Sequence, residues 1–244
     1  MDEITILEQD KINQEIQEIR KDFINKHPEY KDNFKEGYRE GIIDDKEFSA
    51  LNSDKRILWI LKEPNTASFT PSCFKSYSTF KKQKTSYTFK LIAKCSYYLI
   101  EGVYTEDDRK LAEIMKRIAI INIKKTPGGK STNQNNLKEF YSKHKELIKN
   151  QIKLIDPTVI IVANEMKLFV KDLNLTNCGD NNIDYIFTEK GEKGRRRTFK
   201  FKNKLFISSY HPNAKIKHKY YCNEIYKEYQ KWMGEKDSLP EFKF

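Results

Sequence analysis

Four short apolar segments constrain the fold of this chain more than any other feature of its sequence. Each is rich in β-branched or aromatic residues, and none alternates strictly between apolar and polar positions. A strand that is buried on both faces has this pattern, which is typical of a parallel sheet covered by helices. The predicted strands are Arg56–Leu61, Ile118–Asn122, Thr158–Ala163 and Leu205–Tyr210.

Helical patterns separate these strands. Apolar residues recur at intervals of three and four over residues 86–100, 137–154, 164–173 and 219–233, and Asn164 is expected to cap the third helix. Strands that alternate with helices indicate an α/β fold. We therefore expect a three-layer α/β/α sandwich with a central four-stranded parallel sheet.

One more helix is expected before this unit. Its apolar residues follow one another at steps of four, three and four and so share one face, and Pro28 is expected to end it. The residues are Ile12, Ile16, Ile19 and Phe23. We expect an N-terminal helical extension over residues 1–50 and one α/β domain over residues 51–244, because a domain of this size is common.

Polar residues follow three of the predicted strands. Lys62-Glu63-Pro64-Asn65 comes after the first strand, Asn122 ends the second, and His211-Pro212-Asn213 follows the last. Ligands of open parallel sheets bind beyond the carboxyl ends of the strands, so these residues define a candidate site. Each of them, taken singly, also fits an ordinary turn or cap.

The chain has a formal net charge of +11. A genome of low GC content also produces many Lys, Asn and Ile residues, so this charge alone does not establish a polyanionic partner. Part of the excess flanks the candidate site, where it suits contacts with phosphate groups. The expected DNA-binding residues are Lys124, Lys125, Lys130, Ser131, Arg195, Arg196, Arg197, Lys215 and Lys217. The three arginines belong to a loop that we expect to join the two strands of a hairpin, over residues 183–188 and 198–202.

The cysteines argue against a metal site or a disulfide framework. Cys73, Cys95, Cys178 and Cys222 are far apart and form no CxxC pair, so we expect reduced thiols, no metal and no cofactor. The sequence contains no apolar run long enough for a membrane helix and does not begin like a secretory signal. We expect a cytoplasmic monomer that does not bind membranes.

A phosphate loop offers one alternative. Gly129-Lys130-Ser131 fits the end of the motif GxxxxGK[ST], but the position of its first glycine holds Lys124. A nucleotide-binding α/β protein that uses the loop over residues 128–132 therefore remains a lesser hypothesis.

The three strand-end motifs together resemble those of the uracil-DNA glycosylase superfamily. The segment 61–65, Leu-Lys-Glu-Pro-Asn, is similar to that family's first motif. The strand IAIIN, which ends at Asn122, is similar to the strand that carries its base-reading Asn, and the segment 209–213 is similar to its His-Pro motif. The motifs occur in the family's order, and the resemblance spans about residues 55–233.

This resemblance implies hydrolysis of the N-glycosidic bond of a base in DNA. Glu63 would stabilise the sugar cation and orient water, His211 would donate to the departing base, and Asn122 would read the flipped base. The residues implied to contact the substrate are Lys62, Pro64, Asn65, Phe74 and Asn213, and Phe74 is favoured as the stacking ring over Phe69, Tyr77 and Phe80.

Several positions depart from the family's pattern. Leu61 and Lys62 stand where the family has Gly and Gln, Glu63 stands where it has Asp, and Lys215 stands where its best-known members have an apolar wedge. The base therefore stays open: uracil, a damaged base, or a modified base of invading DNA, which would give a role in antiviral defence instead of repair. A catalytically inactive module of the same fold that binds single- or double-stranded DNA is the main alternative.

Overall fold

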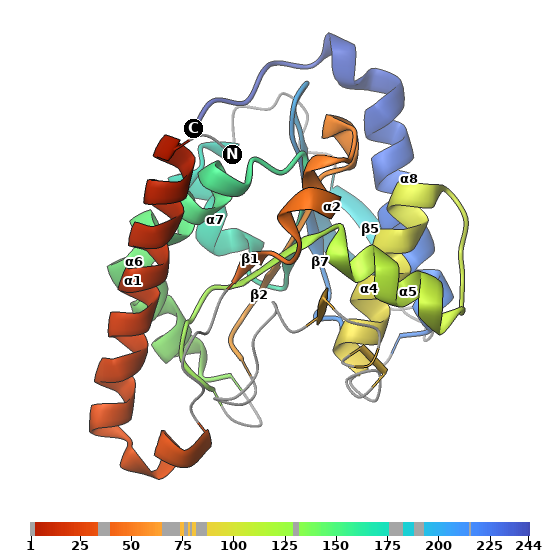
Figure 1. Cartoon of the computed structure of the whole chain (residues 1–244). Helices are drawn as coiled ribbons and strands as arrows, with labels where there is room; N and C mark the ends of the chain where they lie inside the picture. The colour runs from red at the N-terminus through yellow and green to blue at the C-terminus, as the bar shows by residue number, and fades with distance from the viewer. Residues whose placement is uncertain are drawn as a thin grey trace.

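The computed structural model describes residues 3–33, 40–64, 74–75, 78, 80–81, 87–128, 132–175, 183–187, 193–214 and 216–244. It is an α/β protein with a mixed sheet (Figure 1). The strands of the described residues are β1 (Gly41–Ile42), β2 (Ile57–Leu61), β3 (Ala119–Asn122), β4 (Val159–Ala163), β5 (Ile183–Phe187), β6 (Lys193–Lys200) and β7 (Leu205–Ser209), and they pair in the order β1-β3-β2-β4-β7-β6-β5.

The pairing of the strands determines where polar residues meet. β2 is parallel to both β3 and β4, and β4 is parallel to β7. β1, β6 and β5 are antiparallel additions at the two sides of the sheet. Leu61 lies opposite Asn122, and Ala163 lies opposite Ser209, so the carboxyl ends of β2, β3, β4 and β7 lie at one edge.

Helices cover both faces of the sheet, as Figure 1 shows. Trp59 and Ile57 face a core formed with α4, α5 and α8, whereas Leu58 and Ile60 face a core formed with α6 and α7. Both sets are fully buried because alternate residues of a strand point to opposite faces. The helices are α1 (Glu3–Lys26), α2 (Asp45–Ser49), α4 (Tyr87–Glu101), α5 (Asp108–Lys116), α6 (Gln134–Ile155), α7 (Met166–Asp172) and α8 (His218–Glu235), with 3₁₀ turns at Pro28–Asn33, Ser53–Lys55 and Lys236–Ser238.

The α/β class, the four apolar strands and the five helices expected from the sequence are confirmed. Asn164 does not cap α7: its φ of 68° is left-handed, and Glu165 occupies the cap position. The basic segment Arg195–Arg197 lies within β6 and not in the loop of the hairpin, because β6 begins at Lys193. The sequence pattern did not predict α5, α2 and β1.

Within the described residues, no helix has the length and apolar character needed to cross a membrane.

Two buried cysteines meet between α4 and α8. The Sγ atoms of Cys95 and Cys222 lie 2.9 Å apart, and both thiols are free. Burial and the neighbouring thiol raise the pKa of Cys95 well above its ordinary value, which keeps it in the unreactive protonated form. Cys73 and Cys178 lie outside the described residues.

The N-terminal helix is bound to the rest of the fold by its apolar face. Ile12 and Ile16 pack against Leu147 of α6, and the guanidinium of the fully buried Arg20 donates to the backbone oxygen of Lys125 at 3.0 Å. Residues before position 50 therefore contribute to the same packed structure as the sheet.

Replacement of Ile16 by Ala tests this attachment. Ile16 is fully buried, so Ile16→Ala should lower the free energy of unfolding by about 2–4 kcal/mol, measured by chemical denaturation. Leu7→Ala, on the same helix at a position with 56% of its surface exposed, should have an effect below about 0.5 kcal/mol. Equal effects of the two variants would show that α1 does not share the cooperative unfolding of the sheet.

Candidate functional site

The carboxyl edge of the sheet gathers titratable side chains from the ends of four strands. Glu63 follows β2, Lys124 follows β3, Glu165 follows β4 and His211 follows β7. Lys62, the residue directly after β2, forms an ion pair with Glu165. The parallel pairing of the strands therefore brings these residues to one edge, and the contacts of each side chain decide what it can do.

Glu63 forms a largely buried ion pair with Lys124. Lys124 Nζ lies 3.3 Å from Glu63 Oε2, and the two side chains expose only 16% and 6% of their surface. Lys124 Nζ also lies 3.4 Å from the backbone oxygen of Pro127. Glu63 Oε1 is buried without a hydrogen-bond partner among the described residues. One oxygen of the carboxylate is thus held in place, while the other is left to accept a proton or a hydrogen bond.

Gly128 lies directly against this carboxylate. A Cβ atom at position 128 would lie 1.7 Å from Glu63 Cδ, so a larger residue and Glu63 cannot both keep their places. The backbone N–H of Gly128 donates to the oxygen of Pro64 at 3.2 Å, which fixes the loop over Glu63. Here glycine is needed for a close approach of side chain to backbone.

Lys62 and Glu165 form a second ion pair beside the first. Lys62 Nζ lies 3.2 Å from Glu165 Oε1, which also accepts a hydrogen bond of 3.2 Å from the side chain of Gln134. Glu165 Oε2 is buried and has no partner among the described residues. Glu165 was not predicted as a site residue, although it follows a strand end just as Glu63 and His211 do.

His211 is partly buried and is held in one orientation. Its Nδ1 accepts a hydrogen bond of 3.1 Å from the backbone N–H of Asn213, so in the neutral ring the proton is on Nε2. Burial lowers the pKa of His211 below its ordinary value of 6.5, and the nearby charge of Lys62 lowers it further. The imidazole is therefore a neutral hydrogen-bond donor at pH 7.

Asn122 is buried beneath the edge and is engaged by Glu40. Its backbone N–H and its side-chain Nδ2 both donate to the Glu40 carboxylate, at 3.1 and 2.9 Å. Only 2% of Asn122 is exposed. In this conformation the amide has a structural role, and contact with a ligand requires part of this pairing to change.

Lys125 does not belong to a phosphate-facing rim, and that prediction is wrong. The residue is fully buried, and its Nζ contacts Glu40 Oε2 and Gln151 Oε1, each at 2.7 Å, as well as the backbone oxygen of Asn122. Burial lowers the pKa of Lys125, while the carboxylate of Glu40 opposes that shift. Its charge is used inside the protein and cannot reach a phosphate group.

Phe74 is part of the apolar core and does not present a ring to a ligand. It is fully buried, and its ring lies 4.8 Å from that of Phe89 and 6.4 Å from that of Phe80, which is buried as well. The assignment of Phe74 as the stacking ring is therefore corrected.

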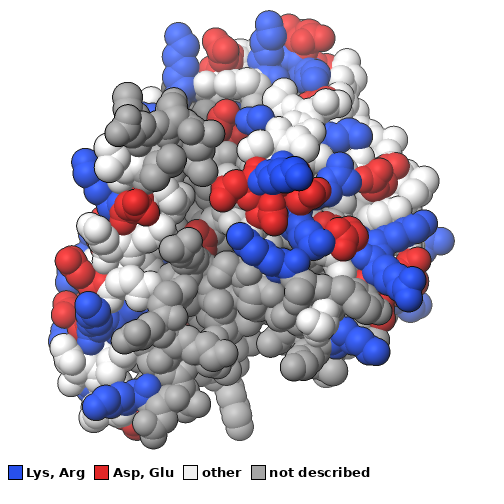
Figure 2. Space-filling model, viewed as in Figure 1, with Lys and Arg blue, Asp and Glu red and all other residues white. Residues whose placement is uncertain are grey.

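The other predicted site residues are spread over the surface or lie outside the described part of the chain. Pro64 is buried beside Glu63, whereas Asn213 and Lys217 are exposed. Figure 2 shows Lys and Arg interspersed with Asp and Glu on the visible face. Asn65, Lys130, Ser131 and Lys215, with Phe69 and Tyr77, lie outside the described residues, as do the side chains of Arg195, Arg196 and Arg197.

The start of α6 argues against a phosphate loop. A phosphate loop leads straight into a helix, whose N-terminus faces the phosphates. α6 begins at Gln134, and the side chain of Asn133 accepts hydrogen bonds from the N–H groups of Asn135 and Asn136. The Gly-Lys-Ser segment therefore ends before the helix, and a side chain already occupies the helix N-terminus.

Comparisons with known proteins add no assignment. No model of a known protein family matches the chain, and a search of curated proteins found no match. Within the described residues, no three His, Cys, Asp or Glu side chains are grouped so that they could hold a metal ion. The geometry of the carboxyl edge is therefore the basis for a function.

Replacement of Gly128 by Ala tests the contact with Glu63. Gly128→Ala should lower the free energy of unfolding by about 1 kcal/mol, because the new Cβ displaces the carboxylate from Lys124. In a Glu63→Ala background the same change should leave the free energy of unfolding unaltered, because the atoms that the new Cβ would meet have been removed. Gly234→Ala, where a Cβ would meet no atom within 4 Å, is the matched control and should be neutral or stabilising. An unchanged cost in the Glu63→Ala background would contradict this contact.

The titration of His211 gives a second test. Its folded-state pKa lies below that of the unfolded chain, so its contribution to stability is present above about pH 6.5 and is lost as the pH falls. NMR titration of the ring protons should give a midpoint below 6.5. Lys62→Met should move that midpoint upward, because it removes a repelling charge. A midpoint at or above 6.5 in the unmodified protein would refute the neutral assignment.

Proposed function

We propose that this protein hydrolyses the N-glycosidic bond of a base in DNA, on a three-layer α/β/α fold like that of uracil-DNA glycosylases. The main support is the buried, half-paired carboxylate of Glu63 at the same sheet edge as the neutral imidazole of His211. In the proposed fold, β3, β2, β4 and β7 are the central parallel strands.

The two groups match the charges that develop when this bond breaks. The sugar becomes positive and the base leaves with negative charge, so the reaction needs an anion near the sugar and a donor near the base. Glu63 supplies the anion, and its Oε1 is the atom that would orient water. His211 supplies the donor through Nε2–H, because Nδ1 is already engaged by Asn213.

Lys124 and Gly128 would act by positioning the carboxylate. Lys124 holds one oxygen, and Gly128 leaves the space in which the group lies. A carboxylate fixed in this way loses little freedom when substrate binds, which is the advantage of a preorganised site. Lys62, held by Glu165, keeps a positive charge near His211 and so favours its neutral form.

A second candidate is a DNA-binding module without catalysis. The pairing of Asn122 with Glu40 and of Glu63 with Lys124 supports it, because the Asn122 amide and one oxygen of the Glu63 carboxylate are engaged inside the protein. Under this proposal Lys217 and the arginines of β6 would contact phosphate groups, and binding would weaken steeply with salt. Formation of an abasic product separates the two candidates.

An assay on modified oligonucleotides tests the proposal. Single- and double-stranded oligonucleotides that carry uracil, damaged bases or modified bases should yield alkali-labile abasic sites with at least one of them. Glu63→Gln and His211→Ala should each lower the rate about 10²–10³-fold while the protein stays folded. Asn122→Ala should weaken discrimination between bases.

Glu146→Gln provides the control, because Glu146 is exposed on α6 and pairs only with Lys149 among the described residues. Its rate should equal that of the unmodified protein. DNA binding without product for every base would support the non-catalytic module. A rate that survives both Glu63→Gln and His211→Ala would refute the assigned roles.

A further inference from the structure

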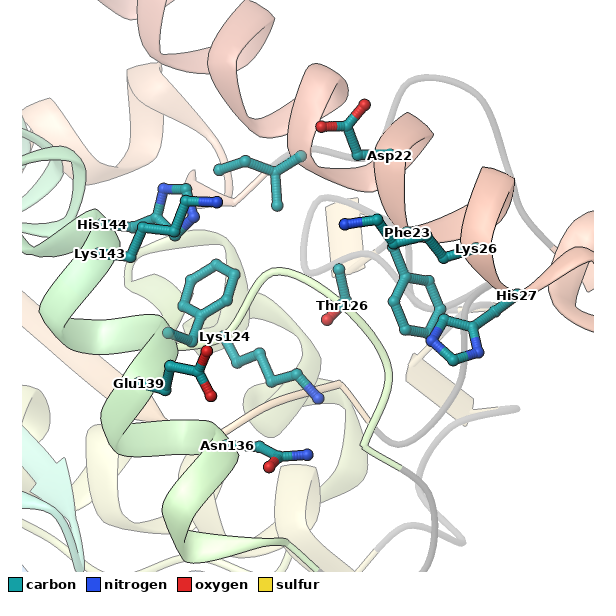
Figure 3. Close-up of a pocket in the computed structure, with 12 residues that line it drawn as sticks. Asp22, Phe23, Lys26, His27, Lys124, Thr126, Asn136, Glu139, Lys143 and His144 are labelled. Carbon is teal, nitrogen blue, oxygen red and sulfur yellow. The ribbon is translucent and has the colours of Figure 1, made fainter.

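A pocket of about 330 Å³ lies between α1 and α6, bordered by the loop that follows β3. It lies next to the place where Ile12 and Ile16 attach α1 to Leu147 of α6. Figure 3 shows side chains of α1 on one side, side chains of α6 on the other, and Lys124 and Thr126 between them. With the exception of Lys124, its lining comes from residues that the proposed reaction does not use.

Two pairs of flat rings line the pocket, one at the end of α1 and one on α6. At the end of α1, the ring centroids of Phe23 and of His27, which directly follows the helix, lie 4.6 Å apart at an interplanar angle of 34°. On α6, those of Phe140 and His144 lie 4.5 Å apart at the same angle. α6 departs from helical geometry at His144, where φ is −119° and ψ is 20°. Two such walls favour a planar ligand, because a ring can stack between them.

The polar groups of the pocket suit an anion joined to that ring. Lys26 and Lys143 are exposed at its rim and form no ion pair with any described residue. Lys124 brings a third ammonium group, and Asn136 and Thr126 add an amide and a hydroxyl. Two carboxylates, Asp22 and Glu139, are also in the lining, and Lys124 shares its charge with Glu63, so Lys26 and Lys143 are the lysines that a ligand meets without a competing ion pair among the described residues. Lysine ammonium groups are common partners of phosphate.

We infer that this pocket binds a nucleoside 5′-monophosphate, with the base between the aromatic walls and the phosphate on the lysines. A volume of about 330 Å³ lies at the lower end of the range for small-ligand sites and suits one nucleotide unit. The same chemistry could be presented by a free mononucleotide or by the 5′-phosphorylated end of a strand. We assign the pocket to the free mononucleotide, independently of the proposed glycosylase activity.

Lys124 connects this pocket with the carboxyl edge. The side chain that lines the pocket is the one that pairs with Glu63 at 3.3 Å. A phosphate group near Lys124 Nζ would compete with the carboxylate of Glu63 for the same charge. Removal of the Glu63 charge should therefore strengthen nucleotide binding. Removal of a lysine from the pocket should have the opposite effect and weaken it.

Calorimetric titration of the full chain tests the inference, with AMP and CMP as probes. Adenosine and inorganic phosphate should each bind at least about tenfold more weakly than AMP, because each lacks one half of the ligand. Lys143→Ala and Phe140→Ala should each weaken AMP binding about tenfold. Glu63→Gln should strengthen it. Lys149→Ala, on the same helix but paired with Glu146 outside the pocket, should leave it unchanged.

Three results would overturn this inference. The first is no measurable binding of either nucleotide. The second is binding that stays the same in both Lys143→Ala and Phe140→Ala, since both side chains are exposed or half-buried and their loss should not unfold the chain. The third is binding of a 5′-phosphorylated oligonucleotide without binding of AMP or CMP, which would assign the pocket to a strand end.

Discussion

The rest of the carboxyl edge depends on one buried ion pair, between Glu40 and Lys125. Both side chains are fully buried, with the Nζ and Oε2 atoms 2.7 Å apart. Glu40 also accepts two hydrogen bonds from Asn122, and Lys125 reaches Gln151 on α6. A buried pair of this kind adds little stability over apolar packing, but loss of one partner leaves an unpaired charge that costs about 3–5 kcal/mol. The segment before β1, the end of β3 and α6 are therefore held in one arrangement.

Internal use of lysines explains why net charge is a poor guide to the surface of this protein. Lys94, Lys125, Lys200 and Lys204 are all less than one tenth exposed, and each pairs with a carboxylate. These residues count toward the formal charge of +11 but cannot face a polyanion. The charge that bears on phosphate binding belongs to the remaining exposed cations, such as Lys217.

The sequence was enough to predict the main strands of the sheet, but it was not enough to predict the contacts of the side chains at their ends. Apolar runs predicted β2, β3, β4 and β7, because burial on both faces leaves a local pattern, and the strand-end rule placed Glu63 and His211 at one edge. The roles of Asn122 and Lys125 could not be read in this way, because their partner Glu40 lies about eighty residues earlier in the chain. β1 and α2 are too short to leave a periodic signal.

The loop after β3 shows why two adjacent lysines have opposite roles. The N–H groups of Ile123 and Lys124 donate to the oxygens of Leu61 and Lys62, each at 2.8 Å, so the parallel pairing of β3 with β2 continues past the strands. The backbone then bends over residues 123–126. Lys124 reaches Glu63, while Lys125 is directed into the buried network with Glu40. The course of the backbone in this loop, and not any difference in residue type, separates a lysine of the candidate site from a lysine of the core.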